Sequence, residues 1–134
     1  MHDSAVVDCS ALVRALADDT PIAEAARTRL SAVSAPVASS LIDYEFMSAL
    51  LGMTRGGKLT PRQASAAMAI YKVLNIDRHE TLGLWERVRE LNHDISAYDA
   101  QYVALAEALD LPLITCDARI ARSGAAKCPV EVFA

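Results

Sequence analysis

The chain has 134 residues, of which 53% are hydrophobic, so it is long enough to bury a core without disulfide or metal staples. We therefore expect a single domain over residues 1–134. The formal net charge of −4 argues against a protein that coats nucleic acid electrostatically, because such binding relies on a surplus of Lys and Arg. It does not exclude a nuclease, since carboxylate active sites are acidic and a bound divalent cation reverses their field.

The cysteines and the first residues bear on cellular location. Cys9, Cys116 and Cys128 are widely spaced and form no CxxC pair, so neither a disulfide framework nor a structural zinc site is indicated. The first apolar run, at 5–7, follows Asp3 and is far too short for a signal-peptide core or a membrane span. We therefore expect a cytoplasmic protein that does not associate with a membrane.

The first half of the chain alternates short apolar runs with patterns of helical spacing. Buried strands are expected at 5–7 and 36–39, and helices at 11–17, 21–30, 41–53 and 61–74. Asp18-Asp19-Thr20-Pro21 has the composition of a helix cap followed by proline at the first helical position. Arg55-Gly56-Gly57 would end the third helix with a cation and then glycine.

The same alternation continues to the last residues. We expect a strand at 75–77, a helix at 79–91, a helix at 97–109 capped by Ser96, a strand at 111–115, a short helix beginning at Asp117 and a strand at 130–133. Alternating strands and helices predict an α/β fold, a three-layer α/β/α sandwich with a mainly parallel central sheet. In such a fold the ligand site lies beyond the carboxyl ends of the strands.

Four acidic residues lie where such a sheet would gather them. Asp8 follows the first strand, and Asp117 follows the strand ending at Thr115, so both are expected as neighbours at the carboxyl edge. Asp99 lies in the first turn of its helix, on the stripe expected to pack on the sheet. Glu45 also falls on an apolar stripe of its helix rather than on the solvated side.

Carboxylates directed at a core are costly unless they are paired or bind a cation, and neighbouring acids raise one another's pKa. A metal ion resolves that conflict, and oxygen ligands without nearby histidines suit Mg²⁺ or Mn²⁺; no organic cofactor is expected. Singly, each acid also has a structural explanation. Asp8 or Asp117 would be a helix cap, Ser96 with Asp99 matches a capping box, and Glu45 would be partly exposed. Together, the four favour a metal site.

Three stretches carry the motifs. Val6-Val7-Asp8-Cys9-Ser10-Ala11-Leu12 is the first, and Tyr44-Glu45 through Gly57-Lys58-Leu59-Thr60 is the second. The most specific is Ser96-Ala97-Tyr98-Asp99-Ala100-Gln101-Tyr102-Val103-Ala104-Leu105-Ala106, followed by Leu111-Pro112-Leu113-Ile114-Thr115-Cys116-Asp117. Over nearly the whole chain the sequence thus resembles the PIN-domain family and, within it, the VapC-like toxins of bacterial and archaeal toxin–antitoxin pairs.

The resemblance implies an acidic catalytic and metal-binding quartet: Asp8, Glu45, Asp99 and Asp117. Asp8 and Asp99 would be the primary ligands, the other two acids would bind a second ion or hold waters, and Ser10 or Thr115 would be a polar helper. The implied activity is hydrolysis of RNA by metal-activated water, leaving 5′-phosphate and 3′-hydroxyl ends. A cognate antitoxin and a homodimer packed through helices are implied as partners. Cys9 and Cys116 depart from the family pattern.

Other residues have less specific interpretations. We expect Cys9 and Cys116 to pack as small buried residues, Trp85 to pack in the core, and His2, His79 and His93 to lie at the surface. Basic residues that flank the proposed site would steer RNA or simply be solvated: Arg14, Arg55, Lys58, Arg62, Arg119 and Arg122.

Two alternatives remain open from the sequence. One is a non-catalytic PIN-like module that binds RNA or protein, against which the intact quartet argues. The other is a receiver-like phosphoacceptor domain, which also gathers acids at strand ends around Mg²⁺. The receiver-like fold requires a lysine after a late strand, and Lys127 fits that position poorly.

Overall fold

A computed structural model describes residues 3–134, so His2 lies outside the described residues. The described chain contains five strands: β1 (Val6–Val7), β2 (Val37–Ser39), β3 (Asp77–His79), β4 (Leu113–Thr115) and β5 (Val130–Val132). They form one sheet in the order β3-β2-β1-β4-β5, and every neighbouring pair is parallel. Val6 and Val7 are fully buried, as expected for a strand at the centre of a parallel sheet with both faces covered.

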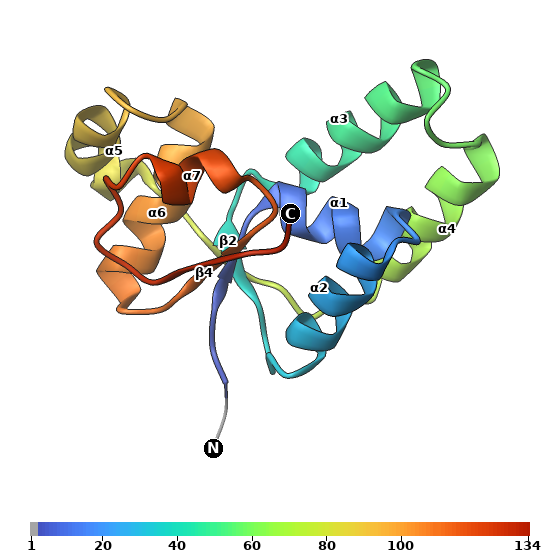
Figure 1. Ribbon diagram of the computed structural model, residues 1–134, viewed down its shortest axis with the longest axis horizontal. Coiled ribbons are helices and arrows are strands. Elements are labelled where there is room, and N and C mark those ends of the chain that lie inside the picture. The colour runs from blue at the N-terminus through green and yellow to red at the C-terminus, as the bar shows by residue number, and fades with distance from the viewer. Residues whose placement is uncertain (1–2) are drawn as a thin grey trace.

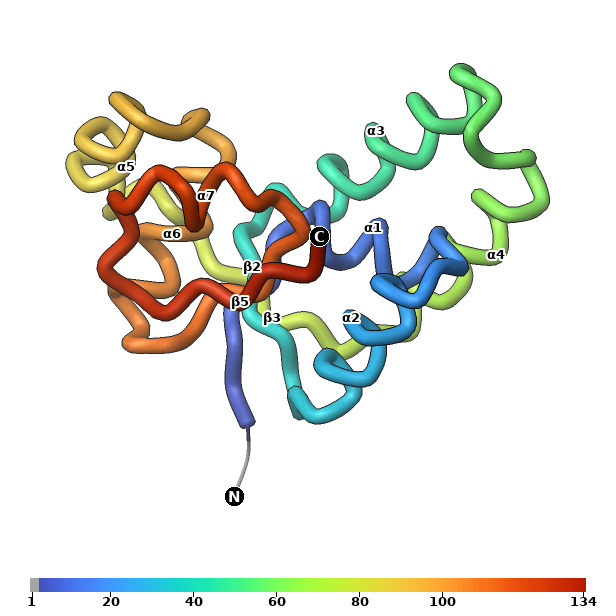
Figure 2. Tube along the Cα trace, viewed as in Figure 1, coloured from blue at the N-terminus to red at the C-terminus, as the bar shows by residue number. Residues whose placement is uncertain are grey.

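Helices cover both faces of this sheet. They are α1 (Cys9–Ala17), α2 (Pro21–Ser31), α3 (Ile42–Arg55), α4 (Pro61–Lys72), α5 (Trp85–Leu91), α6 (Ala97–Leu109) and α7 (Ala118–Arg122). Figure 1 shows α1 to α4 on one side of the strands and α5 and α6 on the other. The three-layer α/β/α sandwich is therefore confirmed. In Figure 2 the turn between α3 and α4 extends away from the sheet at the upper right.

The strand order excludes the receiver-like alternative. Flavodoxin-like receiver domains have the order 2-1-3-4-5, whereas here β1 lies between β2 and β4. The carboxyl end of β1 therefore adjoins the carboxyl ends of β2 and β4. Residues that follow these three strands are brought to one edge of the sheet.

Side-chain caps fix where most helices begin. Asp8, Thr20, Ser96 and Asp117 each accept a hydrogen bond from a backbone N–H in the first turn of the following helix. Each such cap typically stabilises a helix by about 1 kcal/mol. The capping interpretation of Asp8, Asp117 and Ser96 is thus confirmed, and it does not conflict with a second role for the two aspartates.

The segment between α4 and α6 differs from the sequence-based expectation. The strand expected at 75–77 forms at Asp77–His79, and the helix expected from residue 79 begins only at Trp85, after a 3₁₀ turn at Leu82–Leu84. Pairing with β2 places His79 opposite Ser39 and holds these residues extended. The prediction that Trp85 packs in the core is wrong, because its side chain is 67% exposed.

One arginine joins distant parts of the chain. Arg29, in the last turn of α2, forms an ion pair of 2.6 Å with Asp3 and a two-pronged ion pair with Glu131, at 2.7 and 3.1 Å. Asp3 precedes β1 and Glu131 lies in β5.

Within the described residues, no helix is long and apolar enough to cross a bilayer.

Candidate active site

Asp8 lies directly after β1 and is the most buried of the four predicted acids, with 2% of its surface exposed. Its Oδ1 accepts hydrogen bonds from Ser10 Oγ at 2.7 Å and from the backbone N–H of Ala11 at 3.0 Å. Its Oδ2 accepts a short bond from the Thr115 hydroxyl. The two predicted polar helpers therefore both contact Asp8 directly.

The buried environment of Asp8 makes the charged form of its carboxyl group unfavourable. Burial raises its pKa to about 6, although Thr115, Ser10 and Ala11 lower it, and the nearby charge of Asp99 raises it slightly further. Burial without a nearby cation disfavours the ionised form. A positive ion placed beside this side chain would remove that penalty.

The end of β4 is attached to the start of α1 by hydroxyl groups. Ser10 Oγ lies 3.2 Å from Thr115 Oγ1 and accepts a bond of 2.9 Å from the backbone N–H of Cys116. Thr115 Oγ1 accepts a bond of 3.0 Å from the backbone N–H of Asp117. These bonds fix the position of Asp8 and the backbone of Asp117 relative to each other.

Asp99 stands at the electrostatic centre of the four acids. It is half-buried in the first turn of α6. Its pKa is raised by burial first and then by the charge of Asp117. The charge of Asp99 in turn raises the pKa of Asp8 and of Glu45. Asp99 therefore interacts with each of the other three acids.

Glu45 enters the cluster from α3 and is also half-buried. Tyr102 donates its hydroxyl hydrogen to Glu45 Oε1 over 2.7 Å. Burial raises the pKa of Glu45, the bond from Tyr102 opposes that rise, and Asp99 adds to it. The sequence-based site omitted Tyr102, although its position three residues after Asp99 on the same helix placed it on the same face.

Asp117 differs from the other three because it already has a cationic partner. It caps α7, and the Arg119 guanidinium holds it through Nε and Nη2, with the shortest contact at 2.7 Å. This bonding keeps the pKa of Asp117 below its usual value. Arg119 itself is 76% exposed, so the pair lies at the open side of the cluster.

The donor set fits a hard divalent cation that retains much of its water. Among residues 3–134, no three or more His, Cys, Asp or Glu side chains are arranged as a cage that could hold a metal ion. Mg²⁺ does not need such a cage, because it usually binds one or two carboxylates and keeps several waters. Asp8, Glu45 and Asp99, whose pKa values are all raised by burial, are consistent with that mode.

Burial raises the pKa of the two thiols beside the acids, which disfavours their thiolate forms in the metal-free protein. Burial raises the pKa of Cys9 to about 12, with Glu45 and Asp8 adding to the effect, and raises the pKa of Cys116 to about 11. Both side chains pack against the core, as the packing interpretation predicted.

Of the basic residues considered for RNA steering, Arg14 pairs with Asp18.

Two adjoining hollows open beside the acids. The larger, of about 540 Å³, has Cys9, Glu45, Tyr44 and Tyr98 among its lining residues. The smaller, of about 190 Å³, shares Leu41 and Tyr98 with it.

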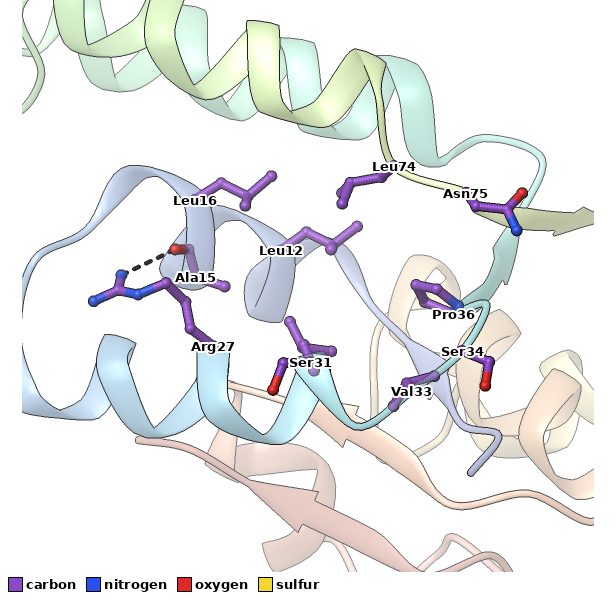
Figure 3. A pocket seen from close by; sticks show the side chains of 11 residues that line it. Leu12, Ala15, Leu16, Arg27, Ser31, Val33, Ser34, Pro36, Leu74 and Asn75 are labelled. Carbon is purple, nitrogen blue, oxygen red and sulfur yellow. Dashed lines mark hydrogen bonds between the residues drawn. The ribbon is translucent and has the colours of Figure 1, made fainter. Parts of the chain in front are cut away.

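A separate cavity of about 310 Å³ lies at the opposite end of the sheet, between α1, α2 and the loops that lead into β2 and β3. Figure 3 shows Leu12, Leu16 and Leu74 projecting into it, with Pro36 at one end. The Arg27 guanidinium is turned to the backbone, where Nη1 donates to the carbonyl of Ala15 at 3.0 Å. The lining of this cavity is mostly apolar, and none of the four acids contributes to it.

The fold is an all-parallel α/β/α sandwich, and acidic side chains gather beyond the carboxyl end of its central strand. This fold and this site together define the class of protein. The chain belongs to the PIN-domain family, whose sequence pattern it matches over residues 5–125. The family resemblance drawn from the motifs is therefore confirmed.

Relatives with similar sequences place the chain among the VapC-like members of that family. It is 38% identical over 127 residues to VapC ribonuclease Mb0985 of Mycobacterium bovis, covering 95% of this chain and 96% of the relative. It is 36% identical over 131 residues to ribonuclease VapC1 of Mycobacterium tuberculosis, covering 97% and 98%. The crystal structure of PAE2754 from Pyrobaculum aerophilum superposes with a TM-score of 0.67 at 26% identity, covering 98% and 92%.

Proposed function

We propose that this protein is an endoribonuclease and the toxin of a toxin–antitoxin pair. The relatives that it matches over nearly their whole length are named VapC ribonucleases. The observation that carries the proposal is the gathering of Asp8, Glu45 and Asp117 around Asp99, with Asp8 buried and hydrogen-bonded by Ser10 and Thr115. In the proposed reaction, a water oxygen attacks the phosphorus and the bond to the 3′-oxygen breaks, leaving 5′-phosphate and 3′-hydroxyl ends.

The proposed cofactor is Mg²⁺ or Mn²⁺, with Asp8 and Asp99 as primary ligands and Glu45 and Asp117 holding a second ion or bound waters. When bound there, a divalent ion would lower the pKa of the attacking water and place positive charge beside the phosphate. Ser10 and Thr115 orient Asp8, and Tyr102 orients Glu45.

Arg119 is an exposed cation beside the acids and is placed to meet a phosphate group. Its guanidinium is bound to Asp117 and is otherwise open to solvent. A planar guanidinium pairs with phosphate oxygens in the same two-pronged geometry that it uses with a carboxylate. We therefore assign Arg119 to substrate binding.

Three further features belong to the same proposal. A cognate antitoxin protein would hold the nuclease inactive, two copies of the chain would associate as a homodimer through their helices, and the protein would act in the cytoplasm. The names of the relatives support a toxin–antitoxin context for the first of these.

Cleavage of a panel of end-labelled RNAs tests the nuclease. The purified protein is incubated with Mg²⁺, with Mn²⁺ or with EDTA, beside the variants Asp8→Asn and Asp99→Asn. Asp110→Asn is a matched control, because Asp110 ends the same helix that Asp99 begins and has a left-handed backbone conformation that asparagine accepts readily. We expect cutting with either metal, none with EDTA, and loss of cutting only in the two site variants.

The contrary result identifies the main alternative. If the folded wild type binds RNA or an antitoxin but cuts nothing in the panel with either metal, the chain is a non-catalytic PIN-like module. If the wild type cuts equally well in EDTA, the proposed metal dependence is wrong while the nuclease assignment stands.

A further inference from the structure

The smaller hollow beside the acids has walls of exposed rings and a polar floor. Tyr98 and Trp85 line it with 62% and 67% of their surfaces exposed, and Leu41 is 50% exposed. Gln101 also lines it but is only 6% exposed, so its amide lies at the bottom. Large apolar side chains that remain solvated around a concave surface commonly mark a binding site.

Hydrogen bonds fix the orientation of the Gln101 amide. Its Oε1 accepts from Ser39 Oγ at 2.8 Å and from Thr81 Oγ1 at 3.1 Å. Ser39 Oγ also accepts the backbone N–H of Leu41 at 3.1 Å, which leaves its own hydrogen to donate to Gln101. Within residues 3–134, the Gln101 Nε2 group has no hydrogen-bond partner. The hollow therefore presents a pre-oriented hydrogen-bond donor at its floor.

The size of the hollow limits what it can hold. Pockets for drug-sized ligands have volumes of roughly 300–1,000 Å³. At about 190 Å³, this hollow matches a single ring system rather than a helix or a folded segment. Flat apolar walls and one fixed donor suit a planar ring that carries an acceptor atom at its edge.

The hollow adjoins the larger one, which reaches Glu45 of the proposed catalytic centre. Tyr98 and Gln101 flank Asp99 in the first turns of α6, and Ser39 ends β2, which pairs with β1 just before Asp8. Leu41 and Tyr98 also line the larger hollow, in which Glu45 forms part of the wall. A strand that passes the acids can therefore place a neighbouring group here.

We propose that this hollow binds one unpaired nucleobase of the RNA next to the cleaved bond, stacked on Trp85 or Tyr98 and bonded through a carbonyl oxygen to Gln101 Nε2. Guanine and the pyrimidines present such a carbonyl oxygen, and adenine does not. Stacking on exposed rings requires a single-stranded segment, because bases in a duplex already stack on each other. The inference rests on the proposed function in taking RNA as the substrate.

Trp85 is the only tryptophan of the chain, so its fluorescence reports on this hollow directly. Short oligouridylate and oligoadenylate are titrated in Mg²⁺ into the full-length chain carrying Asp99→Asn, which should not cut them. Oligouridylate should quench the fluorescence at lower concentration than oligoadenylate, and an RNA duplex should quench it least. Tyr98→Ala should weaken binding by roughly five- to a hundredfold, the usual effect of removing one stacking ring.

Gln101→Glu provides the decisive comparison. It keeps an oxygen for Ser39 and Thr81 but replaces the free donor by an acceptor, so the ratio of uridylate to adenylate affinity should fall and favour the adenine amino group. Val73→Ala is the control, because Val73 is 82% exposed but precedes β3 at the amino end of the strands, whereas the hollow lies beyond their carboxyl ends. An unchanged ratio in folded Gln101→Glu would overturn the proposal.

Other outcomes separate this inference from the proposed function. If fluorescence responds to protein concentration and not to RNA, the hollow takes a side chain of a second copy and the proposal is wrong. If the wild type cuts RNA but the base ratio does not depend on Gln101, the nuclease stands without this base site. If the ratio depends on Gln101 but the wild type never cuts, the base site stands and the nuclease does not.

Discussion

Tyr102 on α6 donates its hydroxyl hydrogen to Glu45 on α3 across 2.7 Å. The two helices lie in different parts of the sandwich, and this bond connects them beside the acids. Tyr102 is almost fully buried, with 1% of its surface exposed, so the bond holds Glu45 in a fixed position. The position of one proposed ligand therefore depends on a neutral side chain of another element.

Replacing Tyr102 by phenylalanine should remove the hydrogen bond that positions Glu45 while keeping the buried aromatic ring. We expect the free energy of unfolding to fall by about 1 kcal/mol, the usual worth of one hydrogen bond. Metal affinity should fall roughly tenfold, the lower end of the effect of removing a group that orients a ligand. Urea unfolding and Mn²⁺ titration measure the two effects. Tyr44→Phe is the control, because Tyr44 is 82% exposed, and an equal loss there would refute the ordering role.

Thr115→Val should leave Asp8 Oδ2 without its hydroxyl donor. Because that bond lowers the pKa of Asp8, the pKa should rise above about 6, and the metal-free protein should lose roughly 1–3 kcal/mol of stability at neutral pH. NMR titration of the Asp8 carboxyl carbon and urea unfolding check both. Thr28→Val is a fair comparison, since the Thr28 hydroxyl bonds to the carbonyl of Glu24 on an exposed helix face and the substitution should change neither quantity.

The titration of Asp8 should make the metal-free protein less stable at neutral pH than at low pH, where Asp8 is protonated. The folded pKa of Asp8 is about 6 and its ordinary value is 3.8. Its stabilising contribution is therefore complete below pH 3.8 and is lost as the pH rises through about 6. Glu45 and Asp99, whose pKa values are also raised, act in the same direction, whereas Asp117, with a lowered pKa, acts in the opposite one.

Asp8→Asn tests this sign directly. In EDTA the variant should be more stable than the wild type by roughly 1–3 kcal/mol near neutral pH, from the size of the pKa shift, and the difference should shrink toward pH 4. Urea unfolding at several pH values gives the curve, with Asp110→Asn as the control. Added Mg²⁺ should raise the melting temperature of the wild type only. A variant that is less stable at every pH would contradict this account of Asp8.

Arg119→Ala should raise the pKa of Asp117 toward its ordinary value, because the bonds from Arg119 are the main reason that it is low. NMR titration of the Asp117 carboxyl carbon measures the change. Arg122→Ala should have a smaller effect, since Arg122 acts on Asp117 through charge alone. Equal shifts in the two variants would show that general surface charge, rather than the Arg119 pairing, sets the value.

Local signals in the sequence were sufficient for the elements that position the acids. The helix expected at 97–109 begins and ends where it was predicted, because a Ser96 cap starts it and Asp110 ends it in the left-handed conformation. Asp8 follows its strand as expected, and Ser10 and Thr115 both contact it. These features depend on residues close together in the chain or on the common edge of a parallel sheet.

The failures concern contacts between distant segments. The extended conformation of Asp77–His79 comes from pairing with β2, which the polar local sequence did not indicate. Trp85 is exposed at the first residue of α5, a helix that begins six residues later than predicted. The role of Gln101 also had no local signal, and only the positions of Ser39 and Thr81 show that its amide is fixed.

The ion pairs of Arg29 have a consequence for how the molecule comes apart. One guanidinium secures both the segment before β1, through Asp3, and the last strand, through Glu131. Loss of this one side chain would release both segments at once, although Asp3 and Glu131 lie more than a hundred residues apart along the chain. Amide hydrogen exchange in the two segments should therefore accelerate together in Arg29→Met.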